Sequence, residues 1–260
     1  MELGIRQRRA LITGAGRGLG RNIAECLAQE GVQIAAISRT QRDVDRLLSA
    51  IASSRGDHVG VIADLTEEDA PLRVMEELSR RSFSPIDIVV HNVGGTLGVT
   101  DPFCSLREWR RVFRLNLEIA IELNLSCIPI MQRQGWGRIV LIGSIAGMEN
   151  HGPVPYCSAK AALIAYGRSL GRVLARDGIV VSVVLPGAVF TEGGYWDMAS
   201  MEKPEHVREY LEKRMAIGRF GRPDEIGKMV AFLCSNHASF CIGSVIPIDG
   251  GQGRSYFGHI

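Results

Sequence analysis

Two residues that could move a proton together stand one helical turn apart. Tyr156 and Lys160 have the spacing i, i+4, which places both side chains on one face of a helix. A free tyrosine has a pKa of about 10, and a nearby ammonium group stabilises the phenolate, so we expect Lys160 to lower the pKa of Tyr156. This pair could then exchange a proton with a substrate at neutral pH. Isolated pairs with this spacing are also common on helix surfaces, so the surrounding sequence has to decide.

The segments around this pair predict how it is positioned. Pro153 and Pro155 predict that the helix begins only at Tyr156, and Gly178 predicts its end. Ser144 follows an apolar run at residues 138–142 that is typical of a buried strand. Because open α/β sheets bind ligands at the carboxyl ends of their strands, the Ser144 hydroxyl could hydrogen-bond a substrate carbonyl.

Asn116 is a polar residue inside an apolar helical stripe. The stripe consists of Trp109, Val112, Phe113, Ala120, Leu123 and Cys127. A buried amide needs hydrogen-bond partners. Asn116 therefore serves either a local structural network or a proton path, in which it positions a water molecule or Lys160. The sequence leaves both interpretations open.

A glycine loop precedes a helix that we expect to begin near Leu19. Glycines at 14, 16, 18 and 20 let the backbone turn tightly and let a pyrophosphate approach amide groups at a helix N-terminus. The spacing of Gly14, Gly18 and Gly20 is G-x-x-x-G-x-G, which differs from the commonest dinucleotide fingerprint. Taken alone, the loop is also compatible with a ligand-free turn.

The next predicted strand ends in Ser38-Arg39, where NAD-binding proteins place a carboxylate. A hydroxyl and a guanidinium at this point, with Arg17 in the glycine loop, favour the 2′-phosphate of NADP(H). We therefore predict NADP(H) in preference to NAD(H). The alternative is that both arginines are solvated surface residues.

Seven short apolar runs alternate with amphipathic helical patterns. This alternation predicts an α/β fold, a single-domain Rossmann-type doubly wound sheet of about seven parallel strands with helices on both faces, over residues 1–260. The least regular stretch, residues 188–220, includes a charged helical piece at 205–214 and is predicted to be a substrate-binding segment. The expected strands are residues 10–13, 32–37, 59–63, 86–91, 138–142, 180–185 and 245–248.

The composition argues against several classes of function. Apolar residues make up 46% of the 260 residues and the net charge is +2, so the charge gives little support for a nucleic-acid or anionic-membrane partner. The sequence contains no run of about 18 apolar residues and no signal-peptide pattern. Six cysteines without a C-x-x-C pair are typical of a protein in the reducing cytoplasm. No His and Cys spacing suggests a metal site.

In their order and spacing, these motifs resemble the short-chain dehydrogenase/reductase family over nearly the whole chain. Further matches are Asp64-Leu65, Asn92-Val93-Gly94, and Pro186-Gly187 with Thr191. The resemblance implies a catalytic tetrad of Asn116, Ser144, Tyr156 and Lys160. The predicted cofactor-binding residues are Gly14, Arg17, Gly18, Leu19, Gly20, Ser38, Arg39, Asp64, Leu65, Asn92, Gly94, Tyr156, Lys160, Pro186, Gly187, Val189 and Thr191.

The segments 218–226, 232–235 and 249–251 are similar to the 3-oxoacyl-[acyl-carrier-protein] reductase branch of that family. The resemblance implies hydride transfer between NADP(H) and a ketone or secondary alcohol. The substrate is either a 3-oxoacyl thioester or a sugar derivative or other secondary-metabolite alcohol. A dinucleotide-binding regulatory protein without turnover is the alternative from another class. The resemblance also implies a homotetramer built from the helices that carry Asn116 and Tyr156.

Two departures from the family pattern concern the predicted site. His91 begins a segment in which the family usually has Asn-Asn-Ala-Gly, and this change is expected to reshape the floor under the nicotinamide. Ser144 precedes Tyr156 by twelve residues, where thirteen is common. Candidates for the substrate pocket are Glu149, His151, Tyr195 and Trp196, and candidates for a basic patch that docks a carrier protein are Arg133, Arg172 and Arg176.

Overall fold

A seven-stranded parallel sheet forms the centre of the molecule, with the strand order β3-β2-β1-β4-β5-β6-β7. The structure, a computed structural model, describes residues 1–54, 56–149 and 152–254. The predicted Rossmann-type fold is confirmed, and strand ends differ from the predicted ones by one or two residues. The strands are β1 Arg9–Thr13, β2 Gln33–Ser38, β3 Val59–Ile62, β4 Ile88–His91, β5 Gly137–Ile142, β6 Ile179–Pro186 and β7 Ser244–Ile248.

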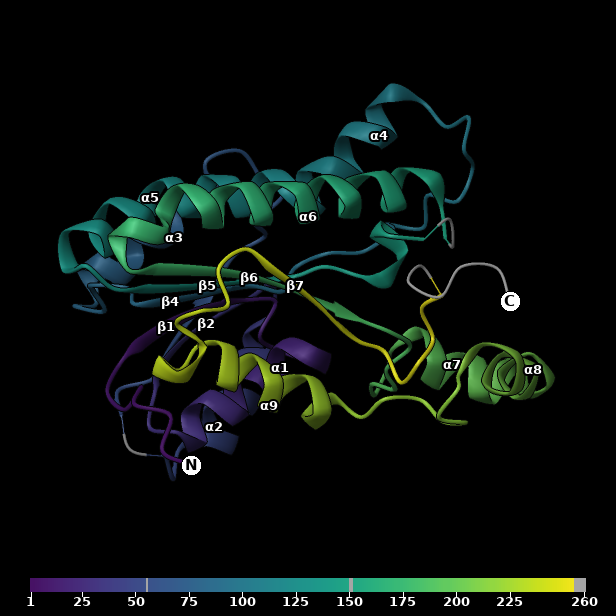
Figure 1. Cartoon of the computed structure of the whole chain (residues 1–260), viewed down its shortest axis with the longest axis horizontal. Coiled ribbons are helices and arrows are strands. Elements are labelled where there is room, and N and C mark those ends of the chain that lie inside the picture. Colours follow the sequence, from purple (N-terminus) through teal and green to yellow (C-terminus); the bar gives the residue numbers. More distant parts are fainter. Residues whose placement is uncertain (55, 150–151, 255–260) are drawn as a thin grey trace.

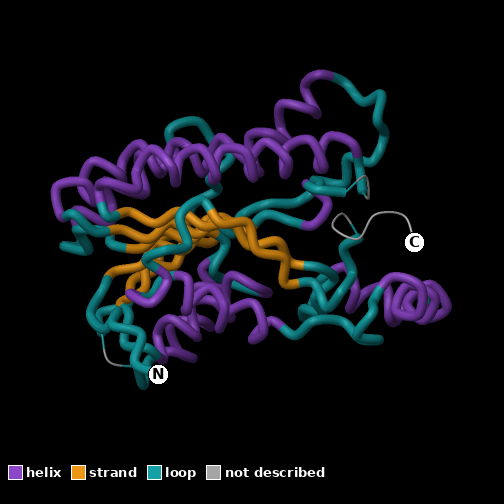
Figure 2. The backbone as a smooth tube through the Cα atoms, viewed as in Figure 1, coloured by secondary structure: helices purple, strands orange, loops and turns teal. Residues whose placement is uncertain are grey.

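Helices cover both faces of this sheet (Figures 1 and 2). One layer contains α1 (Gly18–Gln29), α2 (Gln41–Ile51) and α9 (Pro223–Leu233). The opposite layer contains α3 (Ala70–Arg80), α4 (Leu106–Phe113), α5 (Ile119–Gln134) and α6 (Val154–Leu174). Successive strand residues point to opposite faces, so Leu11 and Ile12 belong to two separate apolar cores.

The strand order reverses between β1 and β4, which are neighbours in the sheet although two strands separate them in sequence. The connections after these two strands leave toward opposite faces, so a crevice opens at their carboxyl ends. The glycine loop follows β1 and the segment Asn92-Val93-Gly94 follows β4. The topology therefore brings these two motifs together at the same edge.

Two expectations about helices are wrong. Helix α6 begins at Val154 and not at Tyr156, because Pro155 lies in the first turn, where a backbone N–H has no partner within the helix. The segment 188–220 is also more regular than expected. It contains α8 (Pro204–Arg214), which matches the predicted charged piece, and also α7 (Tyr195–Glu202), which was not predicted.

In the part of the chain that the structure describes, none of the helices has the length and apolar character needed to cross a lipid bilayer.

Candidate active site

A cavity of about 1460 Å³ lies along the carboxyl edge of the sheet where β1 and β4 meet. Most of the predicted cofactor residues form its wall, but Gly20, Pro186, Tyr156 and Lys160 do not. The predicted residues on the wall are Gly14, Arg17, Gly18, Leu19, Ser38, Arg39, Asp64, Leu65, Asn92, Gly94, Gly187, Val189 and Thr191.

The glycines of the loop after β1 serve different purposes. Gly14 and Gly18 have φ values of 65° and 58°, in the left-handed region that favours glycine. A Cβ at Gly20 would lie 2.2 Å from the carbonyl oxygen of Gly14, so Gly20 permits close packing inside the loop and does not face the cavity. Helix α1 has neither a side-chain cap at Arg17 nor an acidic residue in its first turn. Its first amide groups are therefore suited to a pyrophosphate.

Asn92 fixes the shape of this loop from the end of β4. Its Nδ2 donates to the carbonyl oxygens of Thr13 at 3.1 Å and of Gly14 at 3.2 Å. The hydroxyl of Thr13 in turn accepts from the backbone N–H groups of Asn92 at 2.9 Å and Val93 at 3.1 Å. These bonds tie the two strands on either side of the crevice together.

The end of the cavity at β2 and β3 contains the groups predicted to read the adenosine half of a dinucleotide. A Cβ at Gly16 would lie 2.5 Å from Oγ of Ser38, so the glycine loop packs directly on the end of β2. Asp64 Oδ1 accepts from the hydroxyl of Thr66 at 2.6 Å and from its backbone N–H at 3.0 Å. The Thr66 hydroxyl is the main reason that the pKa of Asp64 is lowered, and the charge of Arg39 adds to this effect.

Sequence reasoning missed a carboxylate on this wall. Asp43, in the first turn of α2, lines the cavity, and its Cβ would lie 2.6 Å from a Cβ at Gly16. The strand end itself has no acidic residue, so the sequence pattern there predicts no ribose-binding carboxylate. Asp43 comes five residues after Ser38, and the turn at Thr40 that starts α2 brings it back to the glycine loop.

The side chains of Ser144 and Tyr156 are neighbours, and the Ser144 hydroxyl acts to lower the pKa of Tyr156. Ser144 directly precedes a short 3₁₀ helix (Ile145–Gly147), and its Oγ accepts from the backbone N–H of Ala146 at 3.2 Å. This contact orients the hydroxyl at the end of β5. The twelve-residue spacing therefore does not separate the two predicted catalytic side chains.

Lys160 is buried one turn further along α6. Its Nζ donates to the carbonyl oxygen of Ile142 at 2.8 Å and lies 5.8 Å from the ring centroid of Tyr156. Burial lowers the pKa of Lys160 to about 8. Burial also raises the pKa of Tyr156, an effect opposed by the hydrogen bond from Ser144. The predicted lowering of the Tyr156 pKa by Lys160 is thus wrong for this structure, because burial outweighs an ammonium group that is directed at a backbone carbonyl.

Asn116 lies in a π-helical turn (Arg114–Glu118) between α4 and α5 and is 2% exposed. Its Nδ2 donates to the carbonyl oxygens of Gly95 and Val112, both at 2.8 Å, and its Oδ1 accepts from the N–H of Gly95 at 3.0 Å. A Cβ at Gly94 would lie 2.8 Å from Nζ of Lys160 and 2.9 Å from Oδ1 of Asn116. Asn116 therefore takes part in a local structural network, which was one of the two interpretations of this residue. It also lies across Gly94 from Lys160, the residue that the other interpretation names.

His91 does not form part of the main cavity. Its Nε2 lies 2.8 Å from Oδ1 of Asn124, whose Nδ2 donates to the hydroxyl of Tyr166 at 3.0 Å. Burial lowers the pKa of His91 to about 4, so the ring is neutral at pH 7. This network links β4 to α5 and α6. The expected change in the floor under the nicotinamide stays a prediction, and of this segment Val93 lies on the cavity wall.

An aromatic cluster holds α7 and α8 beside the cavity. The ring centroid of Trp196 lies 4.2 Å from that of Tyr210, 4.7 Å from that of Phe220 and 4.9 Å from that of Tyr195. Tyr195 and Trp196 both line the cavity, as expected for pocket residues. Of the other pocket candidates, Glu149 accepts a hydrogen bond from the backbone N–H of Arg254, and His151 lies outside the described residues.

Gln252 is a second residue that sequence reasoning missed. It is 2% exposed, its Oε1 accepts from the N–H of Ala188 at 2.7 Å, and its Nε2 donates to the hydroxyl of Tyr210. It thereby connects the turn after β6 with α8. Only the family-like segment 249–251 next to it pointed to this part of the chain.

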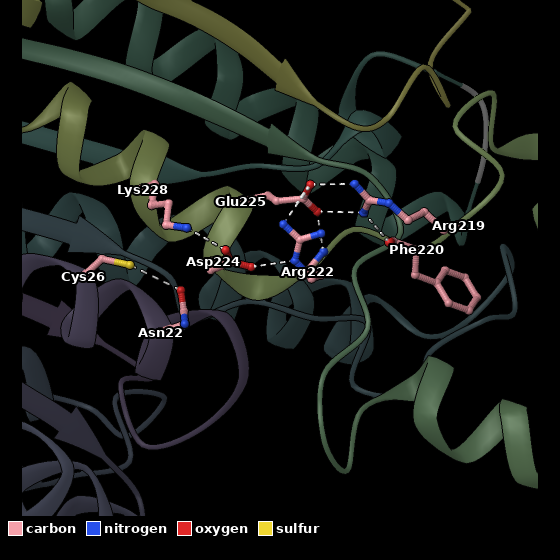
Figure 3. Close-up of polar contacts among 8 residues, drawn as sticks. All are labelled: Asn22, Cys26, Arg219, Phe220, Arg222, Asp224, Glu225 and Lys228. Atoms are coloured by element: carbon pink, nitrogen blue, oxygen red, sulfur yellow. Dashed lines mark hydrogen bonds and ion pairs between the residues drawn. The ribbon is translucent and has the colours of Figure 1, made fainter.

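A charged network fixes the segment that leads from α8 to α9 (Figure 3). Arg219 donates to both carboxylate oxygens of Glu225, at 2.7 and 2.9 Å, and also to the carbonyl oxygen of Phe220 at 3.0 Å. The N–H of Arg222 donates to Glu225 at 2.7 Å. These bonds, above all those from Arg219, lower the pKa of Glu225 to about 2. The network holds Phe220 where it meets the aromatic cluster.

The basic patch predicted near the site is not there. Arg172 is sixteen residues beyond Tyr156 on the same helix, a separation of about 24 Å at 1.5 Å per residue. Arg133 and Arg176 lie near the carboxyl ends of α5 and α6 as well. Among the residues that the structure describes, the arginines that line the cavity are instead Arg17, Arg39, Arg107, Arg110, Arg111 and Arg114.

The sequence model described as "Enoyl-(Acyl carrier protein) reductase" matches residues 14–252. The chain belongs to the short-chain dehydrogenase/reductase family. It is 34% identical over 251 residues to the 3-oxoacyl-[acyl-carrier-protein] reductase FabG of Buchnera aphidicola, which covers 95% of this chain and 98% of the relative. The predicted family and its reductase branch are therefore confirmed, and this short-chain dehydrogenase/reductase is an oxidoreductase.

Two solved structures of the family share the fold closely. A gluconate 5-dehydrogenase from Beutenbergia cavernae with bound NADP has a TM-score of 0.87 and 31% identity, over 97% of this chain and 99% of the other. The L-sorbose reductase of Gluconobacter frateurii, complexed with NADPH and L-sorbose, has a TM-score of 0.89 and 27% identity, over 97% and 98%. These two structures are named for gluconate and L-sorbose, whereas the sequence relative above is named for a 3-oxoacyl group on a carrier protein.

Proposed function

We propose that this protein is an NADP(H)-dependent reductase that converts a ketone into a secondary alcohol. The observation that carries the proposal is the grouping of Ser144 at the end of β5 with Tyr156 and buried Lys160 on α6, at the carboxyl edge of the sheet. A protein that only binds a dinucleotide has no need of a tyrosine, a serine and a lysine in this arrangement. The tetrad of Asn116, Ser144, Tyr156 and Lys160 is accordingly proposed as the catalytic set.

The wall of the cavity fits a dinucleotide, because free helix amides, left-handed glycines and a polar strand end follow one another along it. The loop at Gly14 and Gly18 would hold the pyrophosphate, Asp64 and Leu65 the adenine, and Val189 and Thr191 the nicotinamide carboxamide. When bound, the cofactor supplies a hydride to the carbonyl carbon. Tyr156 donates a proton to the carbonyl oxygen, and Ser144 polarises that oxygen by a hydrogen bond. Lys160 supports the tyrosinate that remains.

A preference for NADP(H) is supported by Arg17, Ser38 and Arg39 and by the NADP-bound relatives. We expect Arg39→Asp to shift the preference toward NADH, because it removes a cation from the 2′-phosphate and adds a repulsive charge next to Asp43. The loss for NADPH should be about tenfold to a hundredfold, the scale of one charge-assisted contact. The measurement is kcat/KM for both cofactors, with Arg42→Asp, in the first turn of α2, as control. If the ratio of kcat/KM for NADPH to kcat/KM for NADH does not change, Arg39 does not contact the cofactor.

For the substrate we propose a 3-oxoacyl thioester, on the strength of the similarity to FabG along nearly the entire chain. A sugar or polyol ketone is the second candidate, and one observation favours it. Helix α7 presents Tyr195 and Trp196 to the cavity, and aromatic rings of this kind pack well against the C–H faces of sugars. Direct comparison of the two substrate classes decides between them.

The deciding experiment measures NADPH oxidation by the purified protein with a short 3-oxoacyl thioester and, in parallel, with a keto-sugar. Tyr156→Phe should retain NADPH binding but lose about a hundredfold or more in turnover, because it removes the proton donor and little volume. Full turnover of this variant would disprove the assignment of Tyr156. Tight NADPH binding without turnover of any ketone would favour a regulatory protein.

We further propose that residues 1–260 form a single domain, with residues 188–220 as its substrate-binding segment, and that the protein works in the cytoplasm as a homotetramer. The family resemblance supports the tetramer. The described helices α5 and α6 carry exposed apolar side chains that such an assembly would cover, among them Leu125 and Val173.

A further inference from the structure

Helix α4 presents a row of arginines to the cavity. Arg107, Arg110, Arg111 and Arg114 have the spacing i, i+3, i+4, i+7, which places them on one face of the helix. All four lie on the cavity wall. Val112, on another face, is buried against α6 through Ala159, so the packing of α4 fixes which side it turns toward the cavity.

One of these arginines anchors the row to the adenine end. Arg114 donates to the carbonyl oxygens of Leu65 and Glu67, both at 3.3 Å, and its charge is balanced by Glu122. Because Leu65 follows the predicted adenine-binding Asp64, the row begins at this loop. It then extends along α4 for seven residues, or about 10 Å, to Arg107.

The other three arginines are not neutralised by the protein. Arg107, Arg110 and Arg111 are exposed and have neither an ion pair nor a side-chain hydrogen bond within residues 1–54, 56–149 and 152–254. Glu108, the nearest acid in sequence, is bound to Ser105 in the capping box that starts α4.

The row faces the cavity from the helical layer opposite to Arg17 and Arg39. Arg17 directly precedes α1 and Arg39 precedes α2, whereas α4 lies in the layer of α5 and α6 (Figure 1). Cations therefore stand on both walls of one end of the cavity. The acidic residues that line the cavity include Asp43, Asp64, Glu118 and Glu192, and Asp64 accepts a hydrogen bond from the hydroxyl of Thr66.

We infer that Arg107, Arg110 and Arg111 form a second anion-binding wall for the adenosine-phosphate end of NADP(H), opposite the wall formed by Arg17 and Arg39. The inference rests on the proposed function, since it concerns the same cofactor. The unpaired guanidinium groups attract the 2′-phosphate, which carries close to two negative charges, and guide it to Ser38 and Arg39. The wall thus adds to the discrimination against NADH, which lacks this phosphate.

The test compares the double variant Arg110→Gln and Arg111→Gln with the wild-type protein in direct binding of NADPH, NADH and adenosine 2′,5′-bisphosphate. We expect the affinity for NADPH and for the bisphosphate to fall about tenfold, mainly through a slower association rate at low salt, and the affinity for NADH to fall much less. The difference should shrink as salt screens the charges. Arg172→Gln, an exposed arginine at the far end of α6, serves as the matched control.

A second double variant, Arg110→Lys with Arg111→Lys, keeps both positive charges and should retain most of the association rate. It thereby distinguishes a loss of charge from a change in the position of the helix. Unchanged affinity and salt dependence in the glutamine variant would overturn the inference. Equal losses of affinity for NADH and NADPH would also overturn the inference. Unchanged NADPH affinity together with a raised KM for a carrier-bound thioester would overturn it too. Failure of the wild-type protein to bind NADPH would instead refute the proposed function, because the binding assay needs no substrate.

Discussion

The state of the Lys160 ammonium group depends on what surrounds it. The carbonyl oxygen of Ile142 is the single hydrogen-bond partner that the described residues offer its Nζ, and burial lowers its pKa from 10.5 to about 8. The neutral and charged forms are therefore both accessible near the upper end of the physiological pH range. Gly94 is essential to this arrangement, because a side chain there would push against both Lys160 and Asn116.

This environment predicts a pH dependence of the reduction. If the charged form of Lys160 supports the tyrosinate, the rate should fall as the pH rises through about 8, since the ammonium group is lost above its lowered pKa. The measurement is kcat for NADPH-dependent reduction between pH 6 and pH 10. Lys160→Met should have a much lower rate without this decline. A wild-type rate that stays level up to pH 10 would contradict the assignment.

At the level of single residues, the sequence predicts which side chains carry out the chemistry better than it predicts the protein environment around them. Tyr156, Ser144 and Lys160 can be found because their types and spacing are characteristic, and the structure brings Ser144 and Tyr156 into contact. The direction of the Tyr156 pKa could not be predicted, because it depends on how much protein surrounds the ring. Asp43 was missed for a similar reason, since its approach to Gly16 depends on where α2 begins.

At the level of elements, the connection from α8 to α9 depends on Glu225. Its pKa is lowered from 4.5 to about 2, first of all by the hydrogen bonds from Arg219. A carboxylate whose pKa is lower in the folded state stabilises that state above the unfolded pKa, and this contribution disappears as the pH falls. The stabilisation is complete above about pH 4.5 and is lost on the way to pH 2.

We therefore expect Glu225→Gln to lower the melting temperature at neutral pH and to make stability less sensitive to acid between pH 4.5 and pH 2. The difference between variant and wild type should vanish only below about pH 2, where Glu225 is protonated in both the folded and the unfolded wild-type protein. Thermal unfolding at a series of pH values measures this. Glu209→Gln, which removes an exposed pair with Lys213, is the control and should have a smaller effect. A difference that stays constant with pH would mean that charge plays no part.

Element boundaries show where sequence patterns stop being informative. The buried strands were predicted to within two residues, because continuous apolar runs are required wherever both faces of a strand are covered. The start of α6 and the existence of α7 were not predicted. Proline is compatible with the first turn of a helix, and α7 is held by contacts of Trp196 with side chains from α8 and from the segment before α9. Such contacts between distant residues leave no local periodicity.

The fold as a whole follows from the alternation of strands and helices, and it explains why residues from several separate segments meet at one edge. Parallel strands place all their carboxyl ends on the same side, so each loop at that side can contribute one group to the cavity. The alternation of strands and helices does not predict which charged side chains line the cavity on the side of α4. The row of arginines on α4 was visible in the sequence as a helical spacing, but only the packing of α4 shows that it faces the cavity.

Association is the property of the whole molecule that the family resemblance predicts. Leu125 on α5 and Val173 on α6 are 70% and 74% exposed in the single chain, and covering them would favour assembly by about 1.5 to 3 kcal/mol for each side chain. We expect the wild-type protein to sediment at four times the mass of its 28.4 kDa chain. Changing both residues to Glu should yield smaller species, because a charge cannot be buried there without a partner. Leu72→Glu on α3, at a position that is 54% exposed, is the matched control and should leave the mass unchanged. A wild-type protein that sediments as a monomer would exclude the tetramer, and a double variant with the full mass would place its interface elsewhere.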